Sequence, residues 1–317
     1  MKNIAPIFLM FLLLAASCNR SGGYVSFSGY AQGGTYTVKY NSGGVSSSVP
    51  EVRDSVEALL RGIDASVSGY NKSSILSRRN GGEQVEKDRF FRELEDSSAF
   101  YREMSGGAFN AAAAPLFDIW GFGFTADSLP DPSRIREALV LVEEGKKLNF
   151  NAIAQGYSCD VVASYLRSLG VKDMLVDIGE IYCCGLNPSG EGWRIGIDEP
   201  RDGNMTPGAS LEGIWNSQGR ACGIVTSGNY RKFYVRDGHK YAHTIDPRTG
   251  YPVEHDLLSA TIVAPSATMA DALATVCMVI GPEASRALIE SNPELEGFLV
   301  TSSGTWASPG FTLENKN

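Results

Sequence analysis

The chain has 317 residues, 43% of them hydrophobic, and carries 28 Lys and Arg against 36 Asp and Glu, a formal net charge of −8. This length and apolar content predict one large or two modest domains with a substantial core, and they exclude a mostly disordered chain. The acidic balance, without any cluster of Lys or Arg, argues against a nucleic-acid partner.

The first 18 residues have the pattern of an export signal. Lys2 precedes an apolar run over residues 4–16, which is too short to span a bilayer but typical of a secretory signal. Its end, Leu14-Ala-Ala-Ser-Cys18, resembles a bacterial lipobox, in which small residues admit the peptidase and the cysteine receives a lipid. An ordinary signal with an incidental cysteine is the alternative interpretation.

We therefore expect three parts in the chain. Residues 1–17 would be a lipoprotein signal peptide, residues 18–33 would hold the lipidated Cys18 and a flexible tether, and residues 34–317 would form one folded domain. The protein would then be anchored by its lipid to a bacterial membrane in the cell envelope and would face the periplasm.

Hydrophobic spacing predicts mainly helices in the first half of the chain and mainly strands in the second. Helices are expected over residues 52–67, 89–104, 156–169, from 265 to 281, and over 283–290. Strands are expected over residues 35–40, 174–185, 193–197, 209–225 and 258–263, with hairpins over 233–241 and around Ser303-Gly304. Helices and strands mix without regular βαβ units, and the predicted fold class is therefore α+β.

Five cysteines follow the signal: Cys159, Cys183, Cys184, Cys222 and Cys277. They form neither a C-x-x-C pair nor a zinc-binding spacing, which makes a metal–thiolate site improbable. Most lie in apolar runs, so we expect buried free thiols, and their spacing leaves open whether any of them pair.

Three segments carry residues that could bind a ligand or take part in catalysis. Asp271 and Thr275 are four residues apart, on one face of an expected helix, where a carboxylate and a hydroxyl could share a hard cation such as Mg²⁺. A solvated Asp and a packed Thr are the alternative reading. His243 leaves a strand beside the turn Asp246-Pro-Arg-Thr-Gly250 and is either a ligand contact, a general base or a hydrogen-bonded structural histidine.

The third segment is the small-residue loop over residues 148–156, which leads into a helix. Such a loop lets backbone groups approach a phosphate or a metal closely, although a tight strand-to-helix turn would look the same. It contains neither a Rossmann nor a P-loop sequence.

Taken together, these segments resemble the ApbE-like family of FAD:protein FMN transferases. Nine matches occur in the order of the family: Gly34-Thr-Tyr36, residues 70–80, Gly107-Ala-Phe109, residues 116–123, residues 152–157 with Asp160, residues 193–197, residues 226–230, residues 243–250 and residues 270–275. The resemblance covers the chain from Gly34 to its end and implies a T-fold-like α+β architecture, with mixed sheets, packed helices and FAD held between two lobes.

The resemblance also implies a reaction. FMN would move from FAD to a Thr or Ser hydroxyl of an acceptor flavoprotein, such as a subunit of an ion-pumping redox complex, with Mg²⁺ as cofactor and AMP as product. A periplasmic FAD pyrophosphatase, which would pass the flavin phosphate to water, and a non-catalytic FAD-binding lipoprotein are the alternatives.

The roles carried over from the family agree with the chemistry of the three segments. Asp271, Thr275 and the carbonyl of Ala152 match magnesium ligands, and Tyr70 matches a position that lines the isoalloxazine. His243 is the candidate for activating the acceptor hydroxyl or orienting phosphate, and Asp246 is the second choice. Other matches to FAD-lining positions are Gly33, Ala108, Phe109, Asn110, Asn149, Gln155 and Ile245.

Four positions depart from the family pattern. Many relatives have Asp in place of Asn110 and Asn149, and Lys or Glu in place of Gln155, so three charges of the flavin pocket would be neutral here. Gly179-Glu180 stands where relatives commonly have two glycines.

Overall fold

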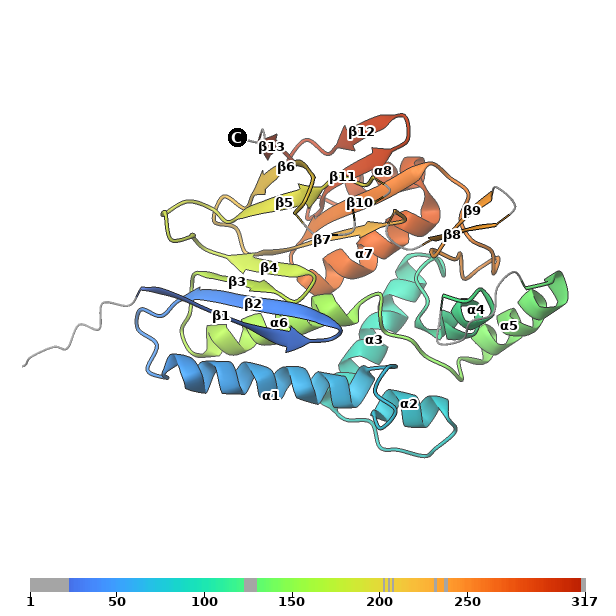
Figure 1. Cartoon of the computed structure of the whole chain (residues 1–317), viewed down its shortest axis with the longest axis horizontal. Helices are drawn as coiled ribbons and strands as arrows, with labels where there is room; N and C mark the ends of the chain where they lie inside the picture. Colours follow the sequence, from blue (N-terminus) through green and yellow to red (C-terminus); the bar gives the residue numbers. More distant parts are fainter. Residues whose placement is uncertain are drawn as a thin grey trace, which may run out of the picture.

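The structure is a computed structural model that describes residues 23–122, 130–201, 203–204, 206, 208–230, 233–236 and 239–314. Its centre is an eight-stranded sheet in which every neighbouring pair is antiparallel (Figure 1). In spatial order the strands are β1 (Tyr24–Ala31), β2 (Gly34–Asn41), β3 (Met174–Asp177), β4 (Ile181–Cys184), β7 (Cys222–Gly228), β10 (Leu257–Ala264), β11 (Glu296–Thr301) and β12 (Gly304–Ala307).

Two smaller sheets complete the β structure. Strands β5 (Arg194–Asp198), β6 (Leu211–Asn216) and β13 (Leu313–Glu314) form one of them, in the order β13-β6-β5. Strands β8 (Phe233–Arg236) and β9 (His239–Ala242) form the predicted hairpin, whose turn lies outside the described residues.

The helices are α1 (Val49–Val67), α2 (Ile75–Asn80), α3 (Arg89–Met104), the 3₁₀ turn η1 (Ala111–Ala113), α4 (Ala114–Ile119), α5 (Pro132–Glu144), α6 (Ala154–Ser168), α7 (Ala267–Ile280) and α8 (Pro282–Glu290). Helices α1, α6 and α7 lie along the large sheet, while α4 and α5 form an outlying pair (Figure 1). None of the described helices is long and apolar enough to cross a membrane.

Helix α7 shows how the sequence produces the core. Ser266 caps its first turn by accepting a hydrogen bond from the Met269 N–H, and Gly281 follows its last residue. Nearly all of its side chains are buried, as expected for a helix that is apolar all round, and Asp271 is its only charged residue.

The large sheet has a narrow junction between its two halves. Strands β1 and β2 pair over eight residues and β10 and β7 over six, but β4 and β7 pair over only three. Helix α6 packs on the half formed by β1 to β4 and helix α7 on the other half, and the two helices contact each other. The junction therefore depends on this helix contact as well as on the strand pairing.

Two glycines allow α7 to approach its neighbours closely. A Cβ at Gly156 of α6 would lie 2.3 Å from the Ala267 carbonyl oxygen, and a Cβ at Gly223 of β7 would lie 2.3 Å from the Ala267 nitrogen. These distances are far below van der Waals contact, so the start of α7 is seated where only glycine fits on both sides.

The predicted α+β class is confirmed, and every helix predicted from periodicity is present. The predicted flexible tether over residues 18–33 is too long, because residues 24–31 form strand β1, paired with β2 along its whole length. Its turn places Gln32 and Gly33 at positive φ (52° and 81°), the geometry of a tight hairpin. Cys18 and the signal segment lie outside the described residues.

Candidate active site

The start of helix α6 lies against the middle of helix α7. The N–H of Gly156 donates a hydrogen bond to Asp271 Oδ2 at 3.0 Å. Gly156 lies in the first turn of α6, where backbone N–H groups have no partner within the helix, and Asp271 supplies that partner. Among the described residues the Ala152 carbonyl, in the turn before α6, accepts no backbone hydrogen bond, and its oxygen is therefore available to a ligand.

Asp271 is a buried carboxylate with few partners. Its exposed fraction is 5%, and within the described part of the chain the Gly156 N–H is the only hydrogen-bond donor to it. Burial raises the pKa of Asp271 to about 7, the negative charge of Asp160 adds to the shift, and the Gly156 hydrogen bond opposes it. A buried carboxyl group that lacks a cation is costly to ionise, which makes this position a candidate for cation binding.

Thr275 lies one helical turn after Asp271 on the same face of α7, and it is half-buried. Carboxylate, hydroxyl and backbone carbonyl oxygens are the ligands that Mg²⁺ prefers. Asp271, Thr275 and the Ala152 carbonyl together offer this kind of ligand set; in the described ranges no cluster of three or more His, Cys, Asp or Glu side chains is found.

Asp160 of α6 fixes the start of α7. Its Oδ1 accepts the Ala267 N–H at 2.9 Å, and its Oδ2 accepts the Thr268 N–H at 2.8 Å and the Thr268 hydroxyl. Burial raises the pKa of Asp160, whereas the hydrogen bonds from Thr268 and Ala267 oppose that rise. These bonds satisfy N–H groups that a helix start leaves open, and they set the position of Asp271 relative to α6.

The burial of Asp271 should make the stability of the metal-free protein depend on pH. In the unfolded chain this carboxyl group titrates near its ordinary pKa of 3.8, whereas in the fold its pKa is about 7. Between these values the folded state binds more protons than the unfolded state, so the free energy of unfolding falls as pH rises. One pKa unit corresponds to about 1.4 kcal/mol, and the loss should reach a few kcal/mol.

Urea unfolding in a chelating buffer, from about pH 5 to about pH 8, measures this dependence. The matched control is Asp271→Asn, which keeps an acceptor for the Gly156 N–H but does not titrate. We expect the wild type to lose stability relative to this variant as pH rises. Parallel curves of unfolding free energy against pH would show that the fold does not raise the pKa of Asp271.

Gln155 connects the α6 start to the turn before β4. Its Nε2 donates to the Ile178 carbonyl at 3.2 Å. A Cβ added to Gly179 would lie only 2.5 Å from the same Nε2 atom. Gly179 also has a φ of +88°, so both the space and the backbone require glycine there. The Gly179-Glu180 turn, where the chain departs from the family pattern, is therefore packed directly against Gln155, a candidate FAD-lining residue.

Asn110 and Asn149 lie in neighbouring turns, because the Asn149 N–H donates to the Ala111 carbonyl at 2.8 Å. Each side-chain oxygen accepts a backbone N–H two residues ahead, from Ala112 at 2.9 Å and from Asn151 at 2.8 Å. Those bonds fix which end of each amide points outward, so both residues present an NH₂ donor where an Asp would present a second acceptor.

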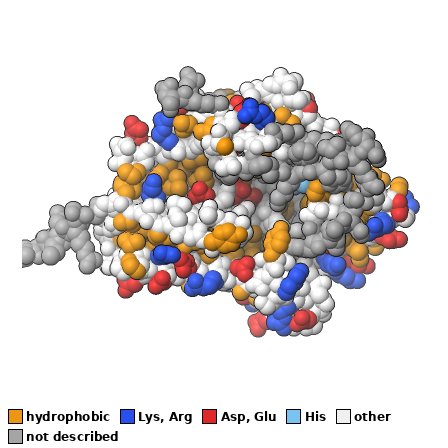
Figure 2. Space-filling view, in the orientation of Figure 1, with side chains coloured by type: hydrophobic (Ala, Val, Ile, Leu, Met, Phe, Trp, Pro, Cys, Tyr) orange, Lys and Arg blue, Asp and Glu red, His pale blue; other side chains and the backbone are white. Residues whose placement is uncertain are grey.

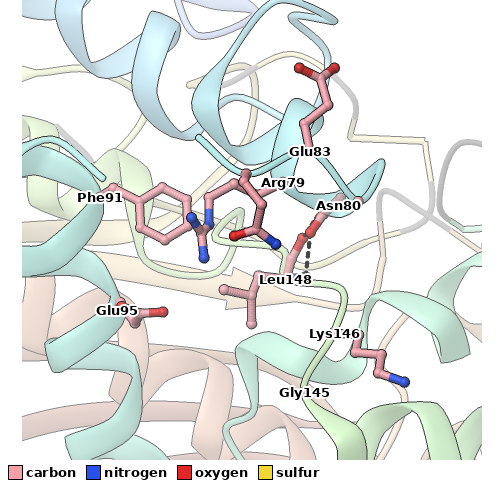
Figure 3. A pocket seen from close by; sticks show the side chains of 10 residues that line it. Arg79, Asn80, Glu83, Phe91, Glu95, Gly145, Lys146 and Leu148 are labelled. Atoms are coloured by element: carbon pink, nitrogen blue, oxygen red, sulfur yellow. Dashed lines mark hydrogen bonds between the residues drawn. The ribbon is translucent and has the colours of Figure 1, made fainter. Parts of the chain in front are cut away.

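The segment before Asn149 is held from the side by α2. The Asn80 side-chain amide donates to the Leu148 carbonyl at 2.8 Å and accepts the Leu148 N–H at 2.9 Å (Figure 3). It thus bonds both backbone groups of Leu148, as the backbone of a neighbouring β-strand would. A pocket of about 270 Å³ lies beside this contact. None of the predicted site residues lines it, so it is a neighbour of the candidate site and not its centre.

Gly33 lies at the exposed tip of the β1–β2 hairpin. The adjacent Gln32 donates a hydrogen bond from its side chain to the Ser158 hydroxyl of α6, which brings the tip to the helix whose start faces Asp271. The space-filling view shows this face of the molecule hollowed near its centre, with acidic and apolar side chains in the hollow (Figure 2).

The two candidate bases differ in their surroundings. His243 is half-buried and its ring meets Phe122 edge-on, with 6.4 Å between ring centroids. Asp246 accepts hydrogen bonds from the Arg248 N–H at 2.9 Å, Nε at 2.8 Å and Nη2 at 2.8 Å. Because Arg248 occupies both carboxylate oxygens, His243 is the better candidate for accepting a proton.

Several other predicted FAD-lining residues are in the core. Ala108, Phe109 and Ile245 are 1–2% exposed, so their side chains pack inside and only their backbones are placed to line a ligand surface. Tyr70 is 69% exposed in the loop after α1, as a residue that stacks on a flavin from outside requires. Tyr70 and His243 lie on segments other than α6 and α7, in the loop after α1 and directly after strand β9.

Arg248 is a site neighbour to which the sequence assigned no role of its own, although it belongs to the turn Asp246-Pro-Arg-Thr-Gly250. A Cβ at Gly107, which has a φ of +85°, would lie 3.5 Å from Arg248 Cγ. The arginine stem therefore covers the turn that leads to Ala108. Only its place in the Asp246 turn, a short-range signal, could have drawn attention to it.

The fold and this arrangement define an α+β protein with an oxygen-lined candidate cation site where two helices cross. The ApbE family model matches residues 32–299, and the chain therefore belongs to the ApbE family. It is 34% identical over 311 residues to the FAD:protein FMN transferase of Vibrio cholerae, covering 90% of each chain. It is 30% identical over 319 residues to that of Haemophilus influenzae, covering 92% of this chain and 91% of the relative.

Solved structures show the same similarity. The apo flavinyl transferase ApbE of Pseudomonas stutzeri matches with a TM-score of 0.79 at 33% identity, covering 91% of this chain and 95% of that one. The flavin transferase ApbE of Vibrio cholerae matches with a TM-score of 0.77 at 29% identity, covering 91% of this chain and 98% of that one. The predicted architecture is thereby confirmed.

Proposed function

We propose that the protein is an FAD:protein FMN transferase, which moves FMN from FAD to a Thr or Ser hydroxyl of an acceptor flavoprotein and releases AMP. Family membership and full-length relatives of that activity support the proposal. The observation that carries it is the buried Asp271 carboxylate, which accepts the Gly156 N–H at the start of α6, four residues after a backbone carbonyl that accepts no backbone hydrogen bond.

We propose that Asp271, Thr275 and the Ala152 carbonyl hold Mg²⁺. When bound, Mg²⁺ would neutralise negative charge on the FAD pyrophosphate and on the departing AMP. The protein contributes the position of the three ligands: Asp160 fixes the start of α7, and the Gly156 N–H orients the Asp271 carboxylate. Such positioning supplies much of the rate in phosphoryl transfer.

The remaining residues would bind FAD and prepare the acceptor. The outward NH₂ groups of Asn110 and Asn149 are hydrogen-bond donors for FAD oxygen or nitrogen atoms. His243 would accept the proton of the acceptor hydroxyl as its oxygen attacks the phosphorus of the FMN moiety. The P–O bond of the pyrophosphate that joins FMN to AMP breaks in the same transfer, so the phosphoanhydride of FAD is exchanged for a phosphodiester between FMN and the acceptor, and AMP leaves.

The activity is tested by following AMP release from FAD and Mg²⁺, with and without an acceptor domain that carries a Thr/Ser flavinylation motif. AMP together with a covalently fluorescent acceptor supports the transferase. AMP with free FMN, regardless of the acceptor, would show an FAD pyrophosphatase instead. Bound FAD without any AMP would identify a carrier lipoprotein and overturn the proposal.

Tyr70 should stack on the isoalloxazine, since its ring is 69% exposed while most other aromatic side chains of the described fold are buried. Tyr70→Ala is expected to weaken FAD binding about 10-fold, because aromatic contacts of this kind are worth roughly 0.5–1.5 kcal/mol beyond their buried area. Tyr70→Phe keeps the ring and should bind FAD as the wild type does. Flavin fluorescence titration measures both affinities, and equal affinity for the Ala variant would refute the stacking role.

We also propose that Cys18 is lipidated and anchors the mature protein to a membrane, facing the periplasm. The short apolar run before it and its lipobox-like context support this. Cys18→Ser is expected to abolish incorporation of labelled palmitate and to release the protein from the membrane fraction. Retained label would mean that the lipid is attached elsewhere.

A further inference from the structure

Two cysteines face each other across the junction of the large sheet. Cys183 of β4 is paired directly with Cys222 of β7, and their sulfur atoms are 3.9 Å apart. Both are reduced in the structure, and their exposed fractions are 0% and 5%. Directly opposed residues in antiparallel strands have Cα atoms about 4.5–5.5 Å apart, within the range that a disulfide spans.

The pair occupies the narrowest part of the sheet. Strands β4 and β7 are joined over three residue pairs, of which Cys183 and Cys222 are the last. The cysteines lie 39 residues apart in the chain, and the segment between them contains β5 and β6. A covalent bond here would close that segment into a loop and join the two halves of the sheet, which carry α6 and α7.

The surroundings favour attack by one of the two thiols. The pKa of Cys222 lies below its usual value, because Cys183 hydrogen-bonds to its sulfur and Arg220 lies nearby, although burial opposes this shift. The pKa of Cys183 is raised, by its interaction with Cys222 and by burial. The Arg220 side chain is 41% exposed and pairs with Glu296, and its positive charge acts on the Cys222 thiol.

We propose that Cys183 and Cys222 form a disulfide when the protein meets a disulfide oxidant, such as oxidised glutathione. The Cys222 thiolate attacks one sulfur of the oxidant, giving a mixed disulfide and releasing one oxidant thiolate. The Cys183 thiolate then attacks the Cys222 sulfur and releases the second. Two protein thiols are oxidised, one oxidant disulfide is reduced, and the two thiol protons end on the released thiols.

This proposal is independent of the FMN transferase activity, because neither cysteine belongs to the candidate active site. The test uses purified protein carrying Cys18→Ser, so that the thiols counted are the five of the described fold. Oxidised glutathione should lower the titratable thiols from five to three. A non-reducing tryptic map should link the peptide over residues 173–194 to the peptide over residues 221–231.

Because the first peptide also contains Cys184, variants assign the bond. Cys184→Ser should keep the link, and Cys183→Ser and Cys222→Ala should each remove it. The oxidised protein should melt about 5–10 °C higher than the reduced one, since cross-linking restricts the unfolded chain, and Cys222→Ala should show no such shift. Five free thiols after oxidation, or a link that depends on Cys184, would overturn the proposal.

Discussion

Asp271→Asn is expected to lower the rate of AMP release from FAD by at least about 1,000-fold, because a cation held by one carboxylate and two neutral oxygens loses its only charged ligand. The protein should remain folded. Asn has nearly the same shape, still accepts the Gly156 N–H, and removes a buried negative charge that the metal-free fold must desolvate. Steady-state kinetics across Mg²⁺ concentrations, with thermal melting beside them, separate loss of catalysis from loss of structure.

Thr275→Ser is the matched control, since Ser keeps the hydroxyl at the same helical position and should retain most of the activity. Thr275→Val, which replaces the hydroxyl with a methyl group, should raise the Mg²⁺ concentration needed for half-maximal rate. Unchanged AMP release by Asp271→Asn at limiting Mg²⁺ would contradict the assignment of the cation to this crossing.

Gly156→Ala is expected to damage both stability and activity. The added Cβ would lie 2.3 Å from the Ala267 carbonyl oxygen and 2.8 Å from Asp271 Cβ. The first neighbour is backbone, so α6 and α7 must separate instead of one side chain turning aside. Overpacking of this kind costs about 1–3 kcal/mol, and the separation also moves the Ala152 carbonyl away from Asp271. Urea unfolding and AMP release measure the two consequences.

Gly34→Ala provides the comparison for the general effect of replacing glycine. Nothing lies within 4 Å of a Cβ at Gly34, and its φ is not positive, so its stability should change little. If Gly156→Ala were as stable and active as Gly34→Ala, the close approach of α6 and α7 would have no part in forming the site.

Periodicity was enough to find the helices that pack on the sheet, because each has an apolar face or, in α7, apolar side chains on nearly every side. Strand β1 was missed although residues 24–31 carry alternating apolar side chains. The glycines before it made the whole segment look like a tether. The six-residue helices α2 and α4 were also missed, since their positions depend on tertiary contacts such as the Trp120 Nε1 bond to the Gly250 carbonyl at 2.8 Å. Helix α5, of 13 residues, was missed although Asp131 caps its start and Gly145 ends it in the left-handed conformation, which are local signals.

The site shows the same division between local and long-range information. The shared face of Asp271 and Thr275 follows from helical spacing alone. That Asp271 is buried could have been inferred from its being the only charge in an otherwise apolar helix. The hydrogen bond from the Gly156 N–H to Asp271 depends on how α6 and α7 cross, and the bonds from Arg248 to Asp246 depend on the conformation of their turn; neither follows from residue spacing alone.

The central claim is that the α6–α7 crossing binds the cation that acts on FAD. A crystal structure of the protein soaked with FAD and Mn²⁺, which has an anomalous signal that Mg²⁺ lacks, tests it most directly. We predict one anomalous peak at about 2.0–2.3 Å from Asp271, Thr275 and the Ala152 carbonyl, in contact with the FAD pyrophosphate. A peak elsewhere, or FAD bound with its pyrophosphate away from Asp271, would contradict the account.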